Sequence, residues 1–207
     1  DMGQHPLFAV DLASGAAKRI VDGGSIGAFD IAGGQLAFAR NTLKSGDQLF
    51  VAGIDGSAAR AITPSAGEMV KDARFGDFEQ FNFKGWNNET VHGYVVKPWN
   101  YEEGKRYPVA FLIHGGPQGS FGNGWSYRWN PQTYAGQGYA VVMIDFHGST
   151  GYGQKFTDSI SQHWGDRPLE DLQKGWVAAQ KKYAFLDGSR ACALGASAQG
   201  DLDSLLR

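Results

Sequence analysis

The sequence predicts an α/β protein in which a parallel sheet follows a segment of short strands. Compact apolar runs at residues 107–113, 139–146 and 191–194 are typical of strands buried on both faces of a parallel sheet. Helical patterns of apolar residues separate these runs, which implies right-handed strand–helix–strand crossovers. Residues 1–71 show a different periodicity, so this fold class applies to the later part of the chain.

The first 71 residues contain short strand-like runs joined by glycine turns. The stretch LFAVDLASGAAKRIV (7–21) resembles LFVAGIDGSAARAIT (49–63). Leu7-Phe8 align with Leu49-Phe50 at an offset of 42 residues. A repeat of about 40–50 residues with four strands is typical of a β-propeller blade. We therefore expect residues 1–71 to form the last one to two blades of a β-propeller, with a small β-meander domain as the alternative.

From residue 72 onward the pattern is that of an α/β domain. Apolar and polar residues alternate on both sides of the turn at residues 86–88, which predicts an antiparallel hairpin. An apolar residue at every fourth position over 156–164 predicts one helix, and a longer apolar stripe over 169–183 predicts another. The start of the second helix is marked by Pro168, Glu170 and Asp171.

Composition excludes several classes of partner and cofactor. The chain has 207 residues and a net charge of −2, so neither nucleic acid nor an anionic membrane surface is a favoured partner. No apolar stretch approaches the roughly 20 residues that span a bilayer. The single cysteine, Cys192, forms no internal disulfide and is expected as a small buried hydrophobe. Neither an H-E-x-x-H motif nor a cysteine cluster is present, so no metal or other cofactor is expected.

Each apolar run ends in a glycine-rich turn, at residues 114–117, 147–151 and 195–200. Ligands of open α/β sheets bind at the carboxyl ends of the strands, so we expect these turns to converge. The third turn, in ACALGASAQG, presents Ser197 between a strand and an expected helix, as a nucleophile elbow does. Ala198 would supply one backbone N–H for an oxyanion. The alternative is that Ser197 caps a helix.

The first turn, His114-Gly115-Gly116-Pro117, is expected to supply the second oxyanion donor. Two backbone N–H groups aimed at a developing oxyanion stabilise the transition state of acyl transfer. Gly116 is the preferred donor and Gly115 the next candidate, whereas Pro117 has no N–H to donate. The alternative is that the turn is a simple loop. His114 is expected as a packed histidine.

At this point the residues resemble a known family, the prolyl oligopeptidase family of serine peptidases. The resembling stretches are HGYVVKP, YPVAFLIHGGP, RACALGAS and the block from Gly136 to Gly175, which together extend over residues 90–198. The match is closest to acylaminoacyl-peptidase and dipeptidyl-peptidase V-like members. The resemblance implies a propeller-capped α/β-hydrolase domain at residues 72–207. It also implies cleavage of short peptides near their N-termini, with Ser197 as nucleophile and Gly116 and Ala198 as oxyanion donors.

The sequence departs from the family pattern at three positions. Gln199 stands where the family has a second glycine, Ala198 where it often has tyrosine, and His147 where it has arginine. All five histidines precede Ser197, whereas the family places its catalytic acid and histidine after the serine. The resemblance therefore predicts a chain that is incomplete at both ends and inactive alone, its partner being the rest of the same polypeptide or a second copy. Relatives of this kind are exported, which favours the periplasm or secretion.

Two other functions remain open. A non-catalytic binding module derived from this fold would carry the altered elbow as a native feature. An unrelated α/β esterase or lipase would use an upstream histidine as its base, with His114 and His147 as the candidates.

Overall fold

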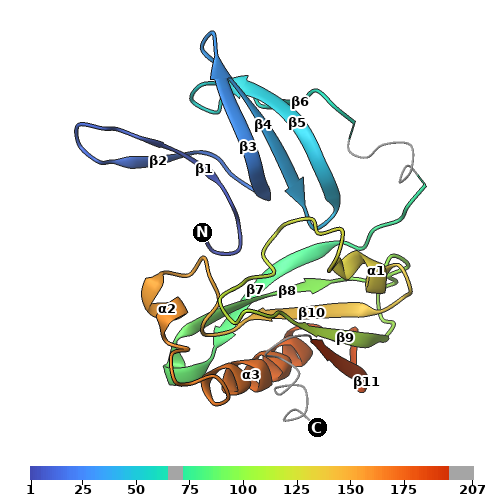
Figure 1. Ribbon diagram of the computed structural model, residues 1–207. Helices are drawn as coiled ribbons and strands as arrows, with labels where there is room; N and C mark the ends of the chain where they lie inside the picture. The colour runs from blue at the N-terminus through green and yellow to red at the C-terminus, as the bar shows by residue number, and fades with distance from the viewer. Residues whose placement is uncertain (65–71, 196–207) are drawn as a thin grey trace. The chain divides into compact units, whose positions relative to one another are not determined.

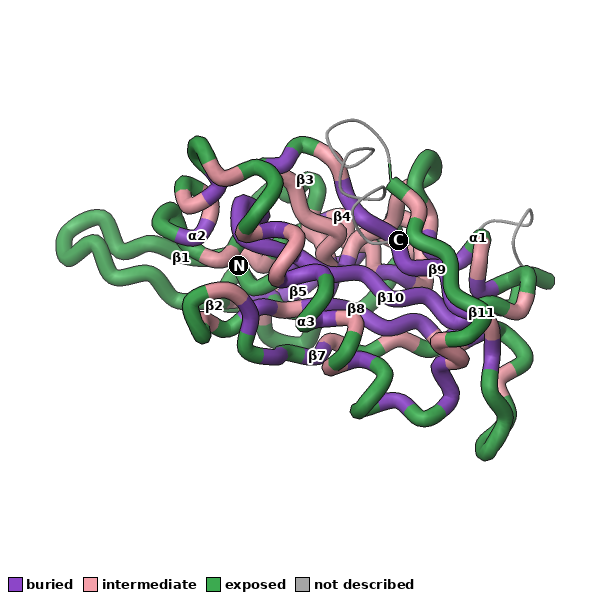
Figure 2. The backbone as a smooth tube through the Cα atoms, turned by 90° about the horizontal axis from the view of Figure 1, so that it is seen from below, coloured by how far each residue is buried: buried purple, intermediate pink, exposed green. Residues whose placement is uncertain are grey.

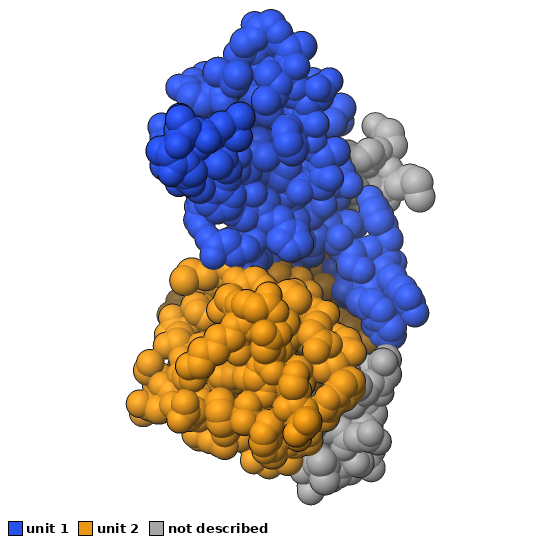
Figure 3. Space-filling model, turned by 60° about the vertical axis from the view of Figure 1, so that its left-hand side comes forward, with its two compact units in different colours: residues 1, 3–73, 123–130 blue, residues 2, 74–122, 131–207 orange. Residues whose placement is uncertain are grey.

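The computed structural model describes residues 1–64 and 72–195 (Figure 1). The chain divides into two compact units, which Figure 3 colours separately. Unit 1 contains Asp1, residues 3–73 and residues 123–130, and unit 2 contains Met2, residues 74–122 and residues 131–207. Residues 123–130 fall within the second domain expected from the sequence, whereas their contacts group them with unit 1.

Unit 1 is built from two antiparallel sheets. A two-stranded sheet pairs β1 (Leu7–Val10) with β2 (Ala17–Val21). The other sheet is a meander with the order β3-β4-β5-β6, whose strands are Ser25–Ala32, Gln35–Thr42, Ser45–Gly53 and Arg60–Ala61. Both a propeller blade and a β-meander domain contain such a sheet, so the propeller stays a prediction.

Segment 123–130 belongs to unit 1 through side-chain and backbone hydrogen bonds. The Asn123 amide oxygen accepts the Leu43 N–H at 3.0 Å, and the Asn123 amide nitrogen donates to Gln4 at 3.0 Å. The Trp125 N–H donates to the side chain of Asn41 at 2.9 Å. These bonds join residues about 80 or more positions apart, which explains why local periodicity does not predict the grouping.

Unit 2 contains a five-stranded mixed sheet with the order β11-β9-β10-β8-β7. Its strands are β7 (Phe78–Lys84), β8 (Thr90–Val96), β9 (Tyr107–Ile113), β10 (Ala140–Asp145) and β11 (Leu186–Gly195). Strands β9, β10 and β11 run parallel, as predicted. Strands β7 and β8 pair antiparallel across a short 3₁₀ turn at Trp86–Asn88, so the predicted hairpin is also confirmed.

Helix α3 (Arg167–Lys182) lies along one face of this sheet (Figure 1). Its buried Leu172 and Ala179 belong to the same apolar core as Phe111, Val142 and Ile144 of the sheet. The apolar stripe predicted over 169–183 therefore faces the core. The side chains on the α3 side of the sheet thus form one continuous apolar core with the buried side chains of that helix.

The helix predicted over residues 156–164 is shorter than expected. Helix α2 is Gln154–Asp158, and the other short helix, α1, is Pro131–Ala135. Ile160 is buried but Trp164 is 54% exposed. Gln162 has a φ of 62°, a left-handed conformation that a continuous helix does not contain. The apolar spacing therefore overestimated the length of this helix.

Burial also differs from the prediction at the last strand. Strands β9 and β10 are almost wholly buried, as expected (Figure 2). Strand β11 is the edge strand of the described sheet and has only one neighbour, so Ala191 and Cys192 are exposed. The expectations that this run is buried on both faces and that Cys192 is a buried hydrophobe are therefore wrong for the described structure.

Candidate active site

The site begins where three neighbouring parallel strands end. Gly195, the last described residue of β11, pairs with Ile113 of β9, and His114 follows Ile113 directly. The adjacent strand β10 ends at Asp145, and the Thr150 N–H from the turn beyond it donates to the carbonyl of Gly119 at 2.9 Å. The first two predicted turns meet, because His114 Nε2 lies 2.8 Å from the Ser149 hydroxyl, whereas Ser197 and Ala198 lie outside the described residues.

Gly116 occupies a backbone conformation that requires glycine. Its φ is 136°, which residues with a Cβ atom rarely adopt. A Cβ atom at this position would lie 2.7 Å from the nitrogen of Gln118 and 3.0 Å from its carbonyl carbon. Gly116 is also exposed to solvent. The main chain at Gly116 is therefore open to solvent, and Gly116 has no side chain of its own to shield it.

His114 is packed, as predicted from the sequence. Its ring stacks on Phe146 with the ring centroids 4.3 Å apart. Nδ1 lies 3.0 Å from the Gly115 carbonyl and Nε2 lies 2.8 Å from the Ser149 hydroxyl. Burial lowers the pKa of His114, so the ring is neutral near pH 7. A carbonyl only accepts, so Nδ1 donates to Gly115 and Nε2 accepts from Ser149.

Asp145 is a buried carboxylate that sequence reasoning missed. Only 1% of its surface is exposed. The Phe121 N–H donates to Oδ1 at 2.9 Å, and the hydroxyls of Ser120 and Tyr152 donate to Oδ2 at 3.1 Å and 2.6 Å. Burial and the nearby Asp145 charge raise the pKa of the Tyr152 hydroxyl, so it stays protonated and donates. The sequence did contain a signal for this site, because an acidic residue stands at the carboxyl end of an apolar strand.

A second buried carboxylate, Asp171, is bonded to His147. Oδ2 of Asp171 accepts the backbone N–H of His147 at 2.7 Å and lies 2.6 Å from His147 Nδ1. Oδ1 accepts the Trp86 N–H at 2.7 Å. Both side chains are completely buried. Asp171 thus joins helix α3 to two turns, and it lies just beyond the first turn, in which Glu170 is the acidic residue.

Neither His114 nor His147 has the environment of a catalytic base. Ser149, the hydroxyl partner of His114, is fully buried and therefore out of reach of a substrate. Asp145 lies 3.8 Å from Nε2 of His114, the nitrogen that already faces Ser149, whereas the acid of a Ser-His-Asp triad bonds the other ring nitrogen. His147 is itself fully buried. The structure gives no support to an esterase that uses either histidine.

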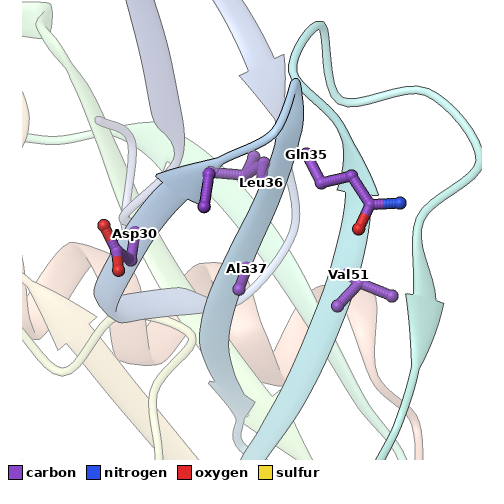
Figure 4. A pocket seen from close by; sticks show the side chains of 6 residues that line it. Asp30, Gln35, Leu36, Ala37 and Val51 are labelled. Carbon is purple, nitrogen blue, oxygen red and sulfur yellow. The ribbon is translucent and has the colours of Figure 1, made fainter.

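Other features of the described residues suggest no second chemistry. Figure 4 shows a hollow on the β3–β5 sheet of unit 1, where Ala37 of β4 lies between Asp30 of β3 and Val51 of β5. Asp30 is the one ionisable residue in its lining. Residues 1–64 and 72–195 contain no cluster of three or more His, Cys, Asp or Glu that could hold a metal ion. In the same residues, every helix is too short or too polar to cross a membrane.

Comparisons with known proteins identify relatives of this chain. Residues 125–202 match the model of the prolyl oligopeptidase family. A probable dipeptidyl-peptidase 5 of Aspergillus clavatus is 38% identical over 207 residues, covering 97% of this chain and 28% of that protein. The family resemblance inferred from the motifs is therefore confirmed.

Solved structures of similar fold include two acylaminoacyl peptidase structures. That of Pyrococcus horikoshii has a TM-score of 0.83 and 25% identity, covering 98% of this chain and 31% of its own. An acylaminoacyl peptidase in complex with Z-Gly-Gly-Phe-chloromethyl ketone has a TM-score of 0.82 and 26% identity, covering 97% and 31%. The chain therefore spans less than a third of the length of each relative.

Proposed function

Since the chain belongs to the prolyl oligopeptidase family, we propose that it supplies the nucleophile and the oxyanion hole of a serine peptidase that cleaves short peptides near their N-termini. The observation that carries the proposal is the exposed turn at Gly116, whose backbone conformation only glycine readily adopts. This turn follows strand β9, and β9 pairs with β11, the strand that leads to Ser197. A nucleophile and an oxyanion donor require this adjacency.

The proposed reaction is acyl transfer through Ser197. A histidine removes the hydroxyl proton as Ser197 Oγ attacks the peptide carbonyl, and the N–H groups of Gly116 and Ala198 donate to the resulting oxyanion. The histidine then protonates the leaving amine, the C–N bond breaks and an acyl-enzyme remains. Water attacks the acyl-enzyme by the same route, which releases the acid and restores the hydroxyl.

None of the five histidines of this chain is assigned as the base, because all of them precede Ser197 and the resembling family places its catalytic histidine after the serine. His114 and His147 are buried in other interactions, His92 stacks on Tyr152 with the centroids 5.2 Å apart, and His163 bonds Asp166 at 2.8 Å. The remaining histidine, His5, makes a backbone bridge to Ser25 in unit 1. We therefore propose that the triad acid and histidine are contributed by the rest of the same polypeptide or by a second copy, and that the 207-residue chain is inactive alone.

We also propose that unit 1 is the end of a β-propeller. The two copies of the sequence repeat form equivalent antiparallel strand pairs, β1–β2 and β5–β6. Phe8 pairs with Arg19 in the first, and Phe50 pairs with Ala61 in the second. One face of the β3–β6 sheet carries apolar side chains that are not buried, notably Leu49 and Ile62, at 48% and 49% exposure. Stacking against another blade would cover that face.

A fluorophosphonate probe tests the serine chemistry. We expect the full-length product of the gene to be labelled at Ser197, and Ser197→Ala to abolish both labelling and peptide hydrolysis. Ser161→Ala, a change at an exposed serine, is the control and should retain both. The 207-residue chain should not be labelled at a comparable rate, because loss of the base alone typically costs ~10⁶ in turnover. Hydrolysis that survives Ser197→Ala would refute the function, and rapid labelling of the 207-residue chain would refute the missing base.

A further inference from the structure

The loop that carries Gly116 is held at both of its ends by the carboxyl end of strand β10. At its beginning, the His114 ring stacks on Phe146, the residue after β10. At its end, the Phe121 N–H and the Ser120 hydroxyl donate to the Asp145 carboxylate. Gly116 lies between these two attachments.

Between these attachments, Pro117 is buried and two backbone hydrogen bonds of Gly119 restrain the chain. The Gly119 N–H donates to the Pro117 carbonyl at 2.8 Å, and the Gly119 carbonyl accepts the Thr150 N–H at 2.9 Å. The φ of 136° at Gly116 is a conformation open to glycine alone, and glycine leaves the backbone many alternatives. The conformation of the loop at Gly116 therefore depends on what holds its two ends.

Asp145 joins three segments at this place, which are strand β10, the loop and the turn after β10. Its carboxylate accepts from the loop through Ser120 and Phe121, and from the turn after β10 through Tyr152. A carboxylate accepts at both oxygens, whereas an amide offers one oxygen and one NH₂ group. The Phe121 N–H can only donate, whereas the hydroxyls of Ser120 and Tyr152 can also accept. An asparagine would therefore keep the Phe121 bond only if both hydroxyls reversed their bonds and accepted from its NH₂ group.

We propose that Asp145 is a positioning residue for the reaction at Ser197. Its carboxylate holds the 114–121 loop so that the Gly116 N–H points to the place where the oxyanion forms. The inference rests on the proposed function, because it concerns the oxyanion hole of that same site. Donors arranged before the reaction are effective because no reorganisation is needed when the charge develops.

The test uses the full-length enzyme with a chromogenic short peptide amide and a peptide aldehyde. The aldehyde forms a tetrahedral adduct with the serine, so its affinity reports on the oxyanion hole. Loss of one oxyanion donor typically costs ~10²–10³ in kcat, and a displaced donor retains part of its effect. We expect Asp145→Asn to lower kcat by about 10- to 100-fold and to weaken the aldehyde in parallel, with KM changed less than about threefold.

The matched control is Asp171→Asn, which alters an equally buried carboxylate that binds Trp86 and His147 instead of the loop. It should destabilise the fold to a similar extent and leave kcat within about threefold of the parent value. If Asp145→Asn does not fold, Tyr152→Phe is measured in its place. It removes one hydrogen bond to Asp145 and should give smaller losses of kcat and of aldehyde affinity.

The inference is overturned if Asp145→Asn, or Tyr152→Phe in its place, behaves like the control, or if kcat falls while aldehyde affinity is unchanged. Retained hydrolysis in Ser197→Ala is a separate outcome, which removes the proposed function itself. The two failures are therefore distinguishable in one set of variants.

Discussion

At the scale of single residues, Gly116 links backbone conformation to the proposed chemistry. In Gly116→Ala the new methyl group would lie 2.7 Å from Gln118 N, at a φ of 136°. The loop must shift to relieve both problems, and the donor shifts with it. We expect peptide hydrolysis by the full-length enzyme to fall by about 10²-fold or more, measured as kcat/KM.

Gly104→Ala is the control for this change. Gly104 also has a positive φ, 82°, but a Cβ there would meet no atom within 4 Å. The substitution should cost about 1–2 kcal/mol of stability through backbone strain and leave kcat/KM unchanged. An equal loss of activity in both variants would mean that strain alone is responsible and that the Gly116 N–H has no special role.

At the scale of elements, local periodicity predicted what depends on neighbouring residues and missed what depends on distant ones. The 86–88 hairpin, the parallel strands β9 and β10 and the stripe of α3 follow from spacing along the chain. The exposure of β11 depends on its place at the edge of the sheet, which spacing does not encode. The nucleophile motif and the HGGP turn were recognisable because their glycines are local, whereas the bonds that join Asp145 to the loop come from residues more than 20 positions away.

The contact of α3 with the sheet gives a prediction in which two effects oppose each other. Gly175 lies in the helix, and a Cβ there would meet Phe83 Cζ at 2.7 Å and Ile144 Cδ1 at 2.8 Å. Alanine is the better helix former by about 1 kcal/mol, but overpacking a core typically costs about 1–3 kcal/mol. We expect overpacking to win, so that Gly175→Ala lowers the midpoint of thermal unfolding followed by circular dichroism. Val177→Ala, on the exposed side of the same helix, should raise it slightly or leave it unchanged, and a rise in both variants would contradict the packing argument.

At the scale of the whole molecule, the uncovered sheet face of unit 1 predicts how the 207-residue chain behaves in solution. Register places Ala37, Ala39, Leu49 and Val51 on one face, and Ile62 bonds to Leu49 beside them. Water-exposed apolar groups on a sheet with open edges favour association with other chains. We expect the 207-residue chain to self-associate at micromolar concentrations in sedimentation velocity experiments, and the full-length protein to do so less.

Substitutions on that face test whether it causes the self-association. Leu49→Lys with Ile62→Lys places two like charges beside each other, so it should shift the sedimenting species towards the monomer. Val177→Lys is the control, because it removes an even more exposed apolar side chain from helix α3 and should leave association unchanged. A 207-residue chain that is already monomeric and unfolds cooperatively would show that the face needs no cover. That result would favour the non-catalytic binding module over a piece of a propeller-capped peptidase, because a self-sufficient unit would not depend on further blades.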